Sequence, residues 1–188
     1  MKKFMISAAL MAACATTTMA QNWIGGSFNV NQQNDSYDNG DSNHGDATAN
    51  NLGFNIDAGH ALNDKWAIAI GLGYHHTEYT SATKGTNSFD ISPYVRRQLA
   101  SWNRLSLFAD AGVAYTLRHQ NGFEVNNHSL LLYIGPGLDY ELNERIGLEA
   151  HFGNLSWEHD WHKEPDYKGN TFDLSLSSYL SLGFYINL

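Results

Sequence analysis

The sequence predicts an all-β fold, an eight-stranded antiparallel transmembrane β-barrel whose strands follow one another as an up-and-down meander. Three observations lead to this prediction. Eight segments alternate apolar with polar residues, which is the period of a strand whose two faces meet different surroundings. The connections between these segments alternate between long and short, and one face of the predicted strands carries no charged residue.

The N-terminus has the organisation of a secretory signal peptide. Lys2 and Lys3 precede an apolar stretch at 4–13, which is too short to span a bilayer as a helix. The small residues of 16–20 then precede a polar segment, as they do at a cleavage site. We therefore expect residues 1–20 to be a signal peptide that is removed on export.

The remaining residues, 21–188, form a single predicted domain, the outer-membrane β-barrel. The only cysteine of the chain is Cys14, so after cleavage no thiol remains for a disulfide, a metal or catalysis. A second interpretation stays open, because residues 11–14 loosely resemble a lipobox that would make Cys14 a lipidated N-terminus. Since 19 acidic residues outnumber 11 basic ones, we expect no nucleic-acid partner.

Each predicted strand is a segment with two-residue alternation, and helical periodicity is not evident anywhere. The even number of strands is what single-chain bacterial barrels require. In chain order, the predicted strands are 23–30, 51–60, 66–75, 89–97, 105–117, 129–142, 146–155 and 172–188.

The connections alternate strictly between two lengths along the chain. Bacterial outer-membrane barrels show this asymmetry, with long extracellular loops and tight periplasmic turns, whereas a soluble β-sandwich has no reason to maintain it. The predicted long connections are 31–50, 76–88, 118–128 and 156–171, and the short ones are 61–65, 98–104 and 143–145.

Two of the short turns are near copies of each other. Residues 62–68 read LNDKWAI and residues 142–148 read LNERIGL. Each places a turn-favouring asparagine and a pair of charged residues between apolar strands, so the chain can reverse without exposing apolar surface to water. The similarity indicates a repeated hairpin.

The two faces of the predicted strands differ in composition. The uncharged face suits lipid, because a charge at the middle of the bilayer would cost about 2–4 kcal/mol. The opposite face holds mainly Gly, Ser, Asn and Asp, which suit a crowded interior where carboxylates such as Asp90 and Glu149 need partners such as Arg96. A soluble sandwich, with the apolar face turned inward, is the alternative fold. Four aromatic residues at strand ends could form the girdles of a barrel: Trp66, Tyr74, Tyr115 and Tyr140.

Two prolines conflict with an uninterrupted barrel. Pro93 and Pro136 fall within predicted strands, and a closed barrel has no free edge at which a missing N–H would be harmless. Glycines flank Pro136, so residues 135–137 predict a bulge or kink. For Pro93 the residues themselves offer no comparable explanation.

Four segments carry a family resemblance: 90–97 (DISPYVRR), 105–115 (LSLFADAGVAY), 135–140 (GPGLDY) and 149–156 (EAHFGNLS). They resemble the outer-membrane β-barrel domain family, the small OmpA/OmpX-like, porin-family barrels of Gram-negative bacteria. The resemblance extends over essentially all of 21–188. It implies an eight-stranded barrel in the outer membrane with both termini in the periplasm, and it implies no single activity.

A catalytic barrel is one alternative, because small barrels include lipid A deacylases and palmitoyltransferases. The nearest histidine and serine pair is His151 with Ser156. Their spacing is an odd number, so in a regular strand the two side chains face opposite sides. We therefore predict that the protein is not an enzyme and has no catalytic residue, with His151 packed in the lumen.

Histidines gather at the predicted extracellular end, in or beside the long connections. The densest segment is 157–164 (WEHDWHKE), where imidazoles and carboxylates could converge on zinc or copper. We favour a solvated acidic loop there, because ligand spacing within a loop is uninformative. The histidines concerned are His44, His75, His76, His119, His128, His159 and His162.

The first long connection contains a second possible metal-binding segment. Residues 32–42 alternate Asp with Asn and Gly as calcium-binding loops do, but the distal Glu of such loops is missing. We expect a surface loop. Our prediction is accordingly that the protein has no metal site, no cofactor site and no cofactor.

The predicted function is that of a non-enzymatic integral outer-membrane barrel with surface loops for structural, adhesive or ligand-interaction roles. The alternative is a narrow channel for small solutes, although an eight-stranded barrel is nearly filled by its own side chains. Inward-facing Tyr94, Phe108, Tyr133 and Tyr179 would obstruct such a channel further.

Expected partners follow from the compartment. Outer-membrane lipid and lipopolysaccharide would surround the barrel, while periplasmic chaperones and the barrel-assembly machinery would handle the chain during biogenesis. Residues 180–188 resemble the C-terminal signal that this machinery recognises, although Leu188 stands where Phe is usual. The sequence names no extracellular ligand.

Overall fold

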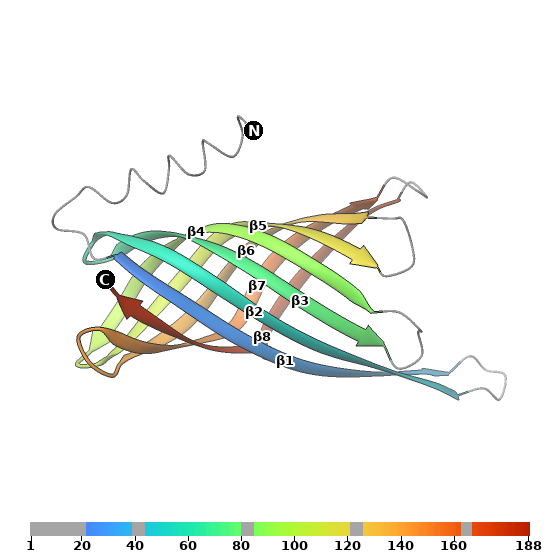
Figure 1. Cartoon of the computed structure of the whole chain (residues 1–188), viewed down its shortest axis with the longest axis horizontal. Helices are drawn as coiled ribbons and strands as arrows, with labels where there is room; N and C mark the ends of the chain where they lie inside the picture. Colours follow the sequence, from blue (N-terminus) through green and yellow to red (C-terminus); the bar gives the residue numbers. More distant parts are fainter. Residues whose placement is uncertain (1–21, 39–43, 80–84, 121–125, 163–166) are drawn as a thin grey trace.

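Eight antiparallel strands, each paired with its neighbours in chain order, close into one barrel, which confirms the predicted fold (Figure 1). The computed structural model describes residues 22–38, 44–79, 85–120, 126–162 and 167–188. The strands are β1 (Asn22–Asp38), β2 (His44–Asn63), β3 (Trp66–Tyr79), β4 (Thr86–Trp102), β5 (Leu105–Gln120), β6 (Asn126–Glu141), β7 (Ile146–His162) and β8 (Tyr167–Asn187).

The two ends of the barrel differ. Three short turns connect β2 to β3, β4 to β5 and β6 to β7 at one end, where β1 begins and β8 ends (Figure 1). We call this the turn end and the opposite one the loop end. In the part of the chain that the structure describes, no helix is long and apolar enough to cross a membrane.

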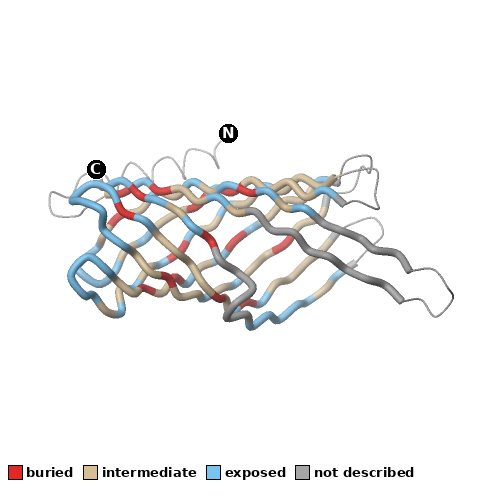
Figure 2. Tube along the Cα trace, turned by 90° about the horizontal axis from the view of Figure 1, so that it is seen from below, coloured by how far each residue is buried: buried red, intermediate tan, exposed pale blue. Residues whose placement is uncertain are grey.

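Side chains alternate between the outside and the inside of the barrel, as predicted. Along β4, Ile91 and Val95 are exposed whereas Tyr94 is buried. Figure 2 shows exposed positions interspersed with intermediate and buried ones along the described parts of the barrel wall. The apolar face is the outer one, which suits lipid and excludes the sandwich alternative. Of the expected girdle residues, Trp66, Tyr115 and Tyr140 are exposed on this face.

The strands are longer than predicted at the loop end. Every predicted long connection is partly strand, because the strands on both sides continue into it. The predicted loop at 156–171, for example, is strand up to His162 and again from Tyr167. Polar composition suggested a loop in these segments, but hydrogen bonding between neighbouring strands extends the ladder beyond the apolar band.

The two similar turns share the same asparagine hydrogen bonds, which supports the predicted hairpin repeat. The Asn63 side-chain oxygen accepts hydrogen bonds from the backbone N–H groups of Lys65 and Trp66 at 3.0 and 3.1 Å. The Asn143 oxygen accepts from Arg145 and Ile146 at 2.9 and 3.0 Å. In the third turn, Asn103 has a φ of 56°, a left-handed conformation that asparagine tolerates better than most residues.

Pro93 is accommodated by a local break in one ladder. The register between β4 and β5 is the same at Ile91–Tyr115 and Tyr94–Gly112, but Ser92 and Pro93 are unpaired between them. On its other side, Pro93 pairs with Ile70 of β3. A closed barrel can thus contain a proline where one neighbouring strand releases its hydrogen bonds over two residues.

Pro136 lies opposite a β-bulge, as the flanking glycines predicted. The register between β6 and β7 shifts between Ile134 and Gly137, and β7 has one extra residue there. Gly153 of β7 has a φ of 77°, which favours glycine. Beyond this bulge the inward and outward positions of β7 are exchanged.

We predict that the turn asparagines stabilise the barrel. Asn63→Ala and Asn143→Ala each remove two backbone contacts, so each should lower the free energy of unfolding by about 1 kcal/mol. Urea unfolding of the protein in detergent micelles measures this change. Asn103→Gly, which preserves a left-handed turn, is the control and should unfold close to wild type. Unchanged unfolding of both alanine variants would refute the role.

Candidate functional site

The centre of the lumen is occupied by an arginine held between two carboxylates. Arg96 of β4 forms a two-pronged pair with Asp110 of β5, with Nε and Nη2 donating at 2.8 and 2.9 Å. Its Nη1 donates to Glu149 of β7, and its Nη2 also reaches the second oxygen of Glu149 at 3.3 Å. These residues link strands that lie far apart in the sequence through the interior.

Aromatic rings surround this ion cluster. The guanidinium of Arg96 lies 3.9 Å from the centre of the Phe108 ring, 5.2 Å from that of Trp23 and 5.8 Å from that of Tyr94. All three rings are buried. A planar guanidinium combines readily with both carboxylates and ring faces, so one side chain can satisfy both kinds of neighbour. We call Arg96, Asp110, Glu149 and these three rings the luminal plug.

Glycines on the adjoining strands make room for the rings of the plug. Phe108 stands directly opposite Gly137 in the register of β5 and β6, and Trp23 stands opposite Gly59 in that of β1 and β2. A Cβ atom at either glycine would overlap the ring. The missing side chain lets each ring lie close against the neighbouring strand within the lumen.

The plug lies between two cavities. The cavity on the loop side has a volume of about 490 Å³ and is lined by Tyr94 and Asp110, among others. The cavity on the turn side has a volume of about 300 Å³ and is lined by Trp23, Arg96 and Glu149. Residues of the plug therefore form the floor of both, and we call them the outer and the inner cavity.

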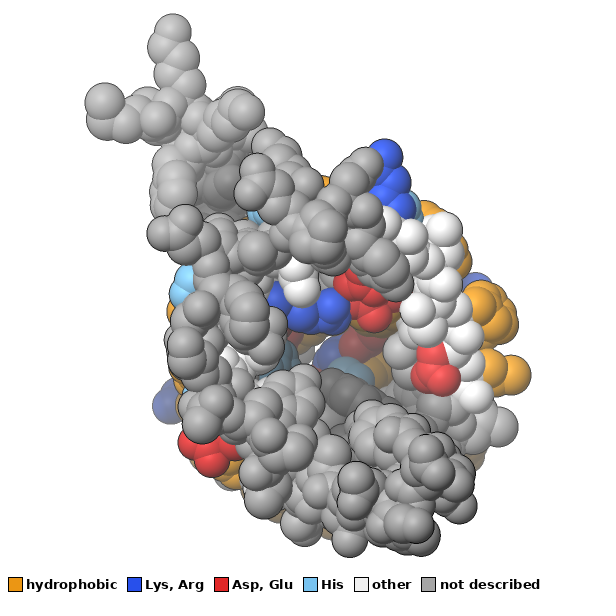
Figure 3. Space-filling view, turned by 90° about the vertical axis from the view of Figure 1, so that its right-hand side faces the viewer, with side chains coloured by type: hydrophobic (Ala, Val, Ile, Leu, Met, Phe, Trp, Pro, Cys, Tyr) orange, Lys and Arg blue, Asp and Glu red, His pale blue; other side chains and the backbone are white. Residues whose placement is uncertain are grey.

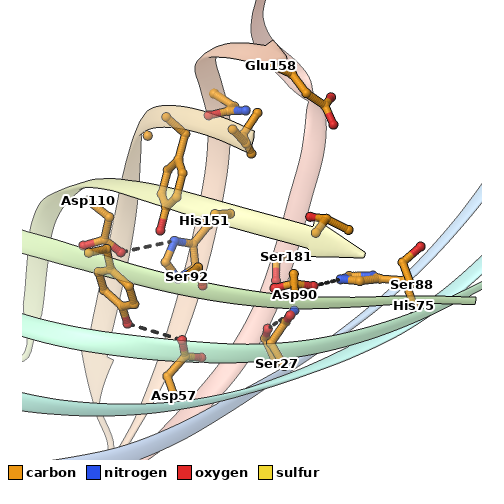
Figure 4. Close-up of a pocket in the computed structure, with 18 of the residues that line it drawn as sticks. Ser27, Asp57, His75, Ser88, Asp90, Ser92, Asp110, His151, Glu158 and Ser181 are labelled. Atoms are coloured by element: carbon orange, nitrogen blue, oxygen red, sulfur yellow. Dashed lines mark hydrogen bonds and ion pairs between the residues drawn. The ribbon is translucent and has the colours of Figure 1, made fainter. Parts of the chain in front are cut away.

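The outer cavity is lined by carboxylates, histidines and hydroxyl groups (Figure 4). His75 pairs with Asp90 through atoms 3.2 Å apart, and His151 lies 3.8 Å from Asp110. Asp57 is 3.5 Å from the hydroxyl of buried Tyr94, at the limit of a hydrogen bond. The chemistry of this lining is polar and mainly acidic.

A second arginine lies farther toward the loop end. Arg118 donates to Glu158 at 2.6 Å and to Asp160 at 2.8 Å, which joins β5 to β7 across the lumen. Figure 3 looks onto the loop end and shows charged side chains of both signs gathered within the opening. Both arginines are thus paired with two carboxylates each.

The predicted luminal partners are partly correct. Glu149 does pair with Arg96, as expected, whereas Asp90 pairs with His75. Asp110, which the sequence did not single out as a partner, is the best-aligned acceptor of Arg96. The side chain of Tyr179, predicted to obstruct the lumen, lies outside the described residues.

The prediction that His151 and Ser156 face opposite sides is wrong. β7 is not a regular strand, because the bulge at Gly153 exchanges its faces between the two residues. Ser156 is buried opposite inward-facing Tyr133, so it faces the lumen as His151 does. His151 contacts Glu149 and Asp110, and no contact between His151 and Ser156 is formed.

The expected acidic loop at 157–164 is also incorrect in its described part, which is strand up to His162. Glu158 faces the lumen, whereas His159 stacks on Trp157 and Trp161 on the outer face. These imidazole and carboxylate groups therefore cannot converge on one metal. Among the described residues, no group of three or more His, Cys, Asp or Glu side chains is arranged to hold a metal ion.

Comparison with known proteins identifies the family. The sequence matches the outer membrane protein beta-barrel domain over residues 5–178. The chain belongs to the outer membrane protein beta-barrel domain family. This membership confirms the predicted resemblance and makes the protein an integral outer-membrane β-barrel protein. A search of curated proteins finds no match to this sequence.

Solved structures with a similar fold include other small barrels of this kind. Neisserial surface protein A has 14% identity and a TM-score of 0.57, with 90% of this chain and 99% of that one covered. OprG from Pseudomonas aeruginosa has 14% identity and a TM-score of 0.55, with 90% of this chain and 95% of that one covered. A major outer membrane protein from Thermus thermophilus has 9% identity and a TM-score of 0.56, with 90% of this chain and 100% of that one covered. These likenesses concern the fold.

We predict that Arg96 is the main stabilising residue of this barrel's interior. Arg96→Ala leaves Asp110 and Glu149 buried without their arginine, with only His151 nearby, and should lower the free energy of unfolding by about 3–5 kcal/mol. Arg97→Ala is the matched control, because Arg97 is exposed on the outer face and should contribute less than about 1 kcal/mol. Urea unfolding in micelles measures both, and equal effects would contradict the prediction.

Proposed function

We propose that this barrel is a non-conducting and non-enzymatic surface protein, with its loop end facing the outside of the cell and its turn end the periplasm. The observation that carries the proposal is the luminal plug. Arg96 and its two carboxylates, packed among three buried rings, stand between the outer and the inner cavity. Contacts with the surroundings would then be made by the loop end and the outer cavity, in a structural, adhesive or ligand-binding role.

The polar contacts of the outer cavity support a non-enzymatic role. The two described histidines of its lining, His75 and His151, contact carboxylates. A serine hydrolase needs its hydroxyl within hydrogen-bond reach of the base that activates it. Neither histidine makes such a contact to a serine hydroxyl within the described ranges.

A narrow channel is the second candidate function, and the paired cavities favour it. Residues of the plug line both cavities, so a rearrangement of Arg96 and Phe108 could join the outer and the inner cavity. Breaking both ion pairs in the interior would carry a large energetic cost. The closed state is therefore the one that we propose to prevail.

The outer-membrane location also implies partners for this protein during assembly and in the membrane. The last strand pairs with both β7 and β1, and its outward Leu182, Phe184 and Ile186 are exposed apolar side chains. This arrangement supports recognition of the C-terminal segment by the barrel-assembly machinery, with delivery by periplasmic chaperones. Once folded, the same side chains would contact outer-membrane lipid.

Conductance across a planar bilayer tests the proposal. The wild-type protein should give no discrete conductance steps, because the plug closes the lumen. Arg96→Ala combined with Phe108→Ala should produce small steps, since it removes the centre of the plug. Arg97→Ala, on the outer face of the same strand, should remain silent. Steady wild-type steps would favour the channel and refute the non-conducting role.

A further inference from the structure

A ladder of five stacked or adjoining rings lies on β5, β6 and β7 toward the loop end. On β7, the ring of His159 stacks with those of Trp157 and Trp161, at centroid distances of 6.0 and 5.6 Å. Trp161 also stacks on His128 of β6 at 5.7 Å. Tyr115 of β5 completes the ladder, 6.1 Å from His128. We call these five residues the His–Trp ladder.

The His–Trp ladder lies on the outer face of the barrel. Trp157 stands opposite Leu132 of β6 and Phe172 of β8, and directly opposed residues share a face of the sheet. Trp157, Leu132 and Phe172 are 38%, 44% and 71% exposed, respectively. Leu155 and Leu174, the next opposed pair toward the turn end, are exposed as well. The ladder therefore borders an apolar surface that faces the membrane.

Each histidine of the ladder is oriented by a hydrogen bond through Nδ1. Nδ1 of His128 lies 2.7 Å from the Tyr115 hydroxyl, and Nδ1 of His159 lies 2.9 Å from the side-chain oxygen of Asn170. In both rings Nε2 makes no hydrogen bond to a described residue. A Tyr115 hydroxyl that donates to Nδ1 leaves His128 with an Nε2–H, and Nε2 is the ring nitrogen that His159 leaves open to a ligand.

The outer face around the ladder lacks described carboxylates. Glu158 and Asp160 alternate with the ladder residues along β7, but both turn inward to Arg118. Lys168 of β8 is exposed and stands opposite Trp161, on the same outer face. Because Glu158 and Asp160 pair with Arg118 inside the lumen, the outer face keeps Lys168 and the histidines without a described carboxylate beside them, which suits an anion.

We propose that the His–Trp ladder and Lys168 bind a phosphate-bearing lipid of the outer leaflet, such as lipid A. The acyl chains would lie on the exposed apolar surface at Leu155 and Leu174, and the phosphate would accept hydrogen bonds from the imidazole Nε2 groups and Lys168. Trp rings suit this depth, because they combine an apolar body with a polar N–H. The inference rests on the proposed orientation, with the loop end at the outer leaflet.

Native mass spectrometry of the full chain in a non-ionic detergent tests the site. The protein is titrated with lipid A and with lipid A from which the phosphates have been removed. We expect wild type to bind lipid A at least about tenfold more tightly than the dephosphorylated form, because charge-assisted hydrogen bonds are lost. His159→Gln with Lys168→Gln should reduce lipid A binding to the level of the dephosphorylated lipid.

A matched control separates this site from basic residues elsewhere. His76→Gln with Lys65→Gln makes the same two exchanges on β3 and in the turn before it, and it should bind lipid A as wild type does. All variants should keep the heat-dependent gel mobility of a folded barrel. Equal binding of the two lipids, or full binding by the His159→Gln, Lys168→Gln variant, would overturn the proposal.

Inorganic phosphate distinguishes a lipid site from a site for free phosphate. Millimolar phosphate should leave lipid A bound, since the acyl chains contribute burial that the free ion lacks. Complete displacement would overturn the lipid assignment. The lipid measurement and the conductance measurement are independent, because a barrel that conducts ions could still bind lipid A and a closed barrel could fail to do so.

Discussion

The packing of this barrel's interior depends on the pairing of one buried arginine with two carboxylates. Arg96, Asp110 and Glu149 come from three strands, and each would be costly to bury without the others. Their mutual pairing, together with the rings packed on the guanidinium, lets a polar cluster take the place that an apolar core has in a soluble protein. The opposing glycines at 59 and 137 belong to the same arrangement, since they provide space for the rings.

The ion pairs in the lumen also determine which side chains of β7 lie on the outer surface of the barrel. Arg118 holds Glu158 and Asp160 in the lumen, while their neighbours on β7 form the outward ladder of His159 and the tryptophans. One strand thus presents an ion pair network on one face and an aromatic, basic surface on the other. The alternation of a β-strand is sufficient for this separation, because successive residues face opposite sides.

Much of this structure could be predicted from the sequence, because two-residue alternation and turn chemistry are local. The eight strands, the turns at Asn63 and Asn143 and the pairing of Arg96 with Glu149 were all expected. The bulge at Gly153 was not, since it depends on how β7 meets the neighbouring strand at Pro136. Because of that single extra residue, later side chains of β7 face the opposite side of the barrel wall from the one that a regular strand would give them. The inward Ser156 and the His–Trp ladder were therefore missed.

The most direct test of the luminal plug is the accessibility of two positions on β4 that lie on either side of Arg96. Ser92 lines the outer cavity and Gln98 the inner one. With Cys14→Ser as background and Asp64→Cys as a marker of orientation, a membrane-impermeant thiol reagent is added to one side of vesicles containing Ser92→Cys or Gln98→Cys. A closed lumen predicts labelling of Ser92→Cys from the loop side only and of Gln98→Cys from the turn side only. Labelling of either cysteine from both sides would contradict the account.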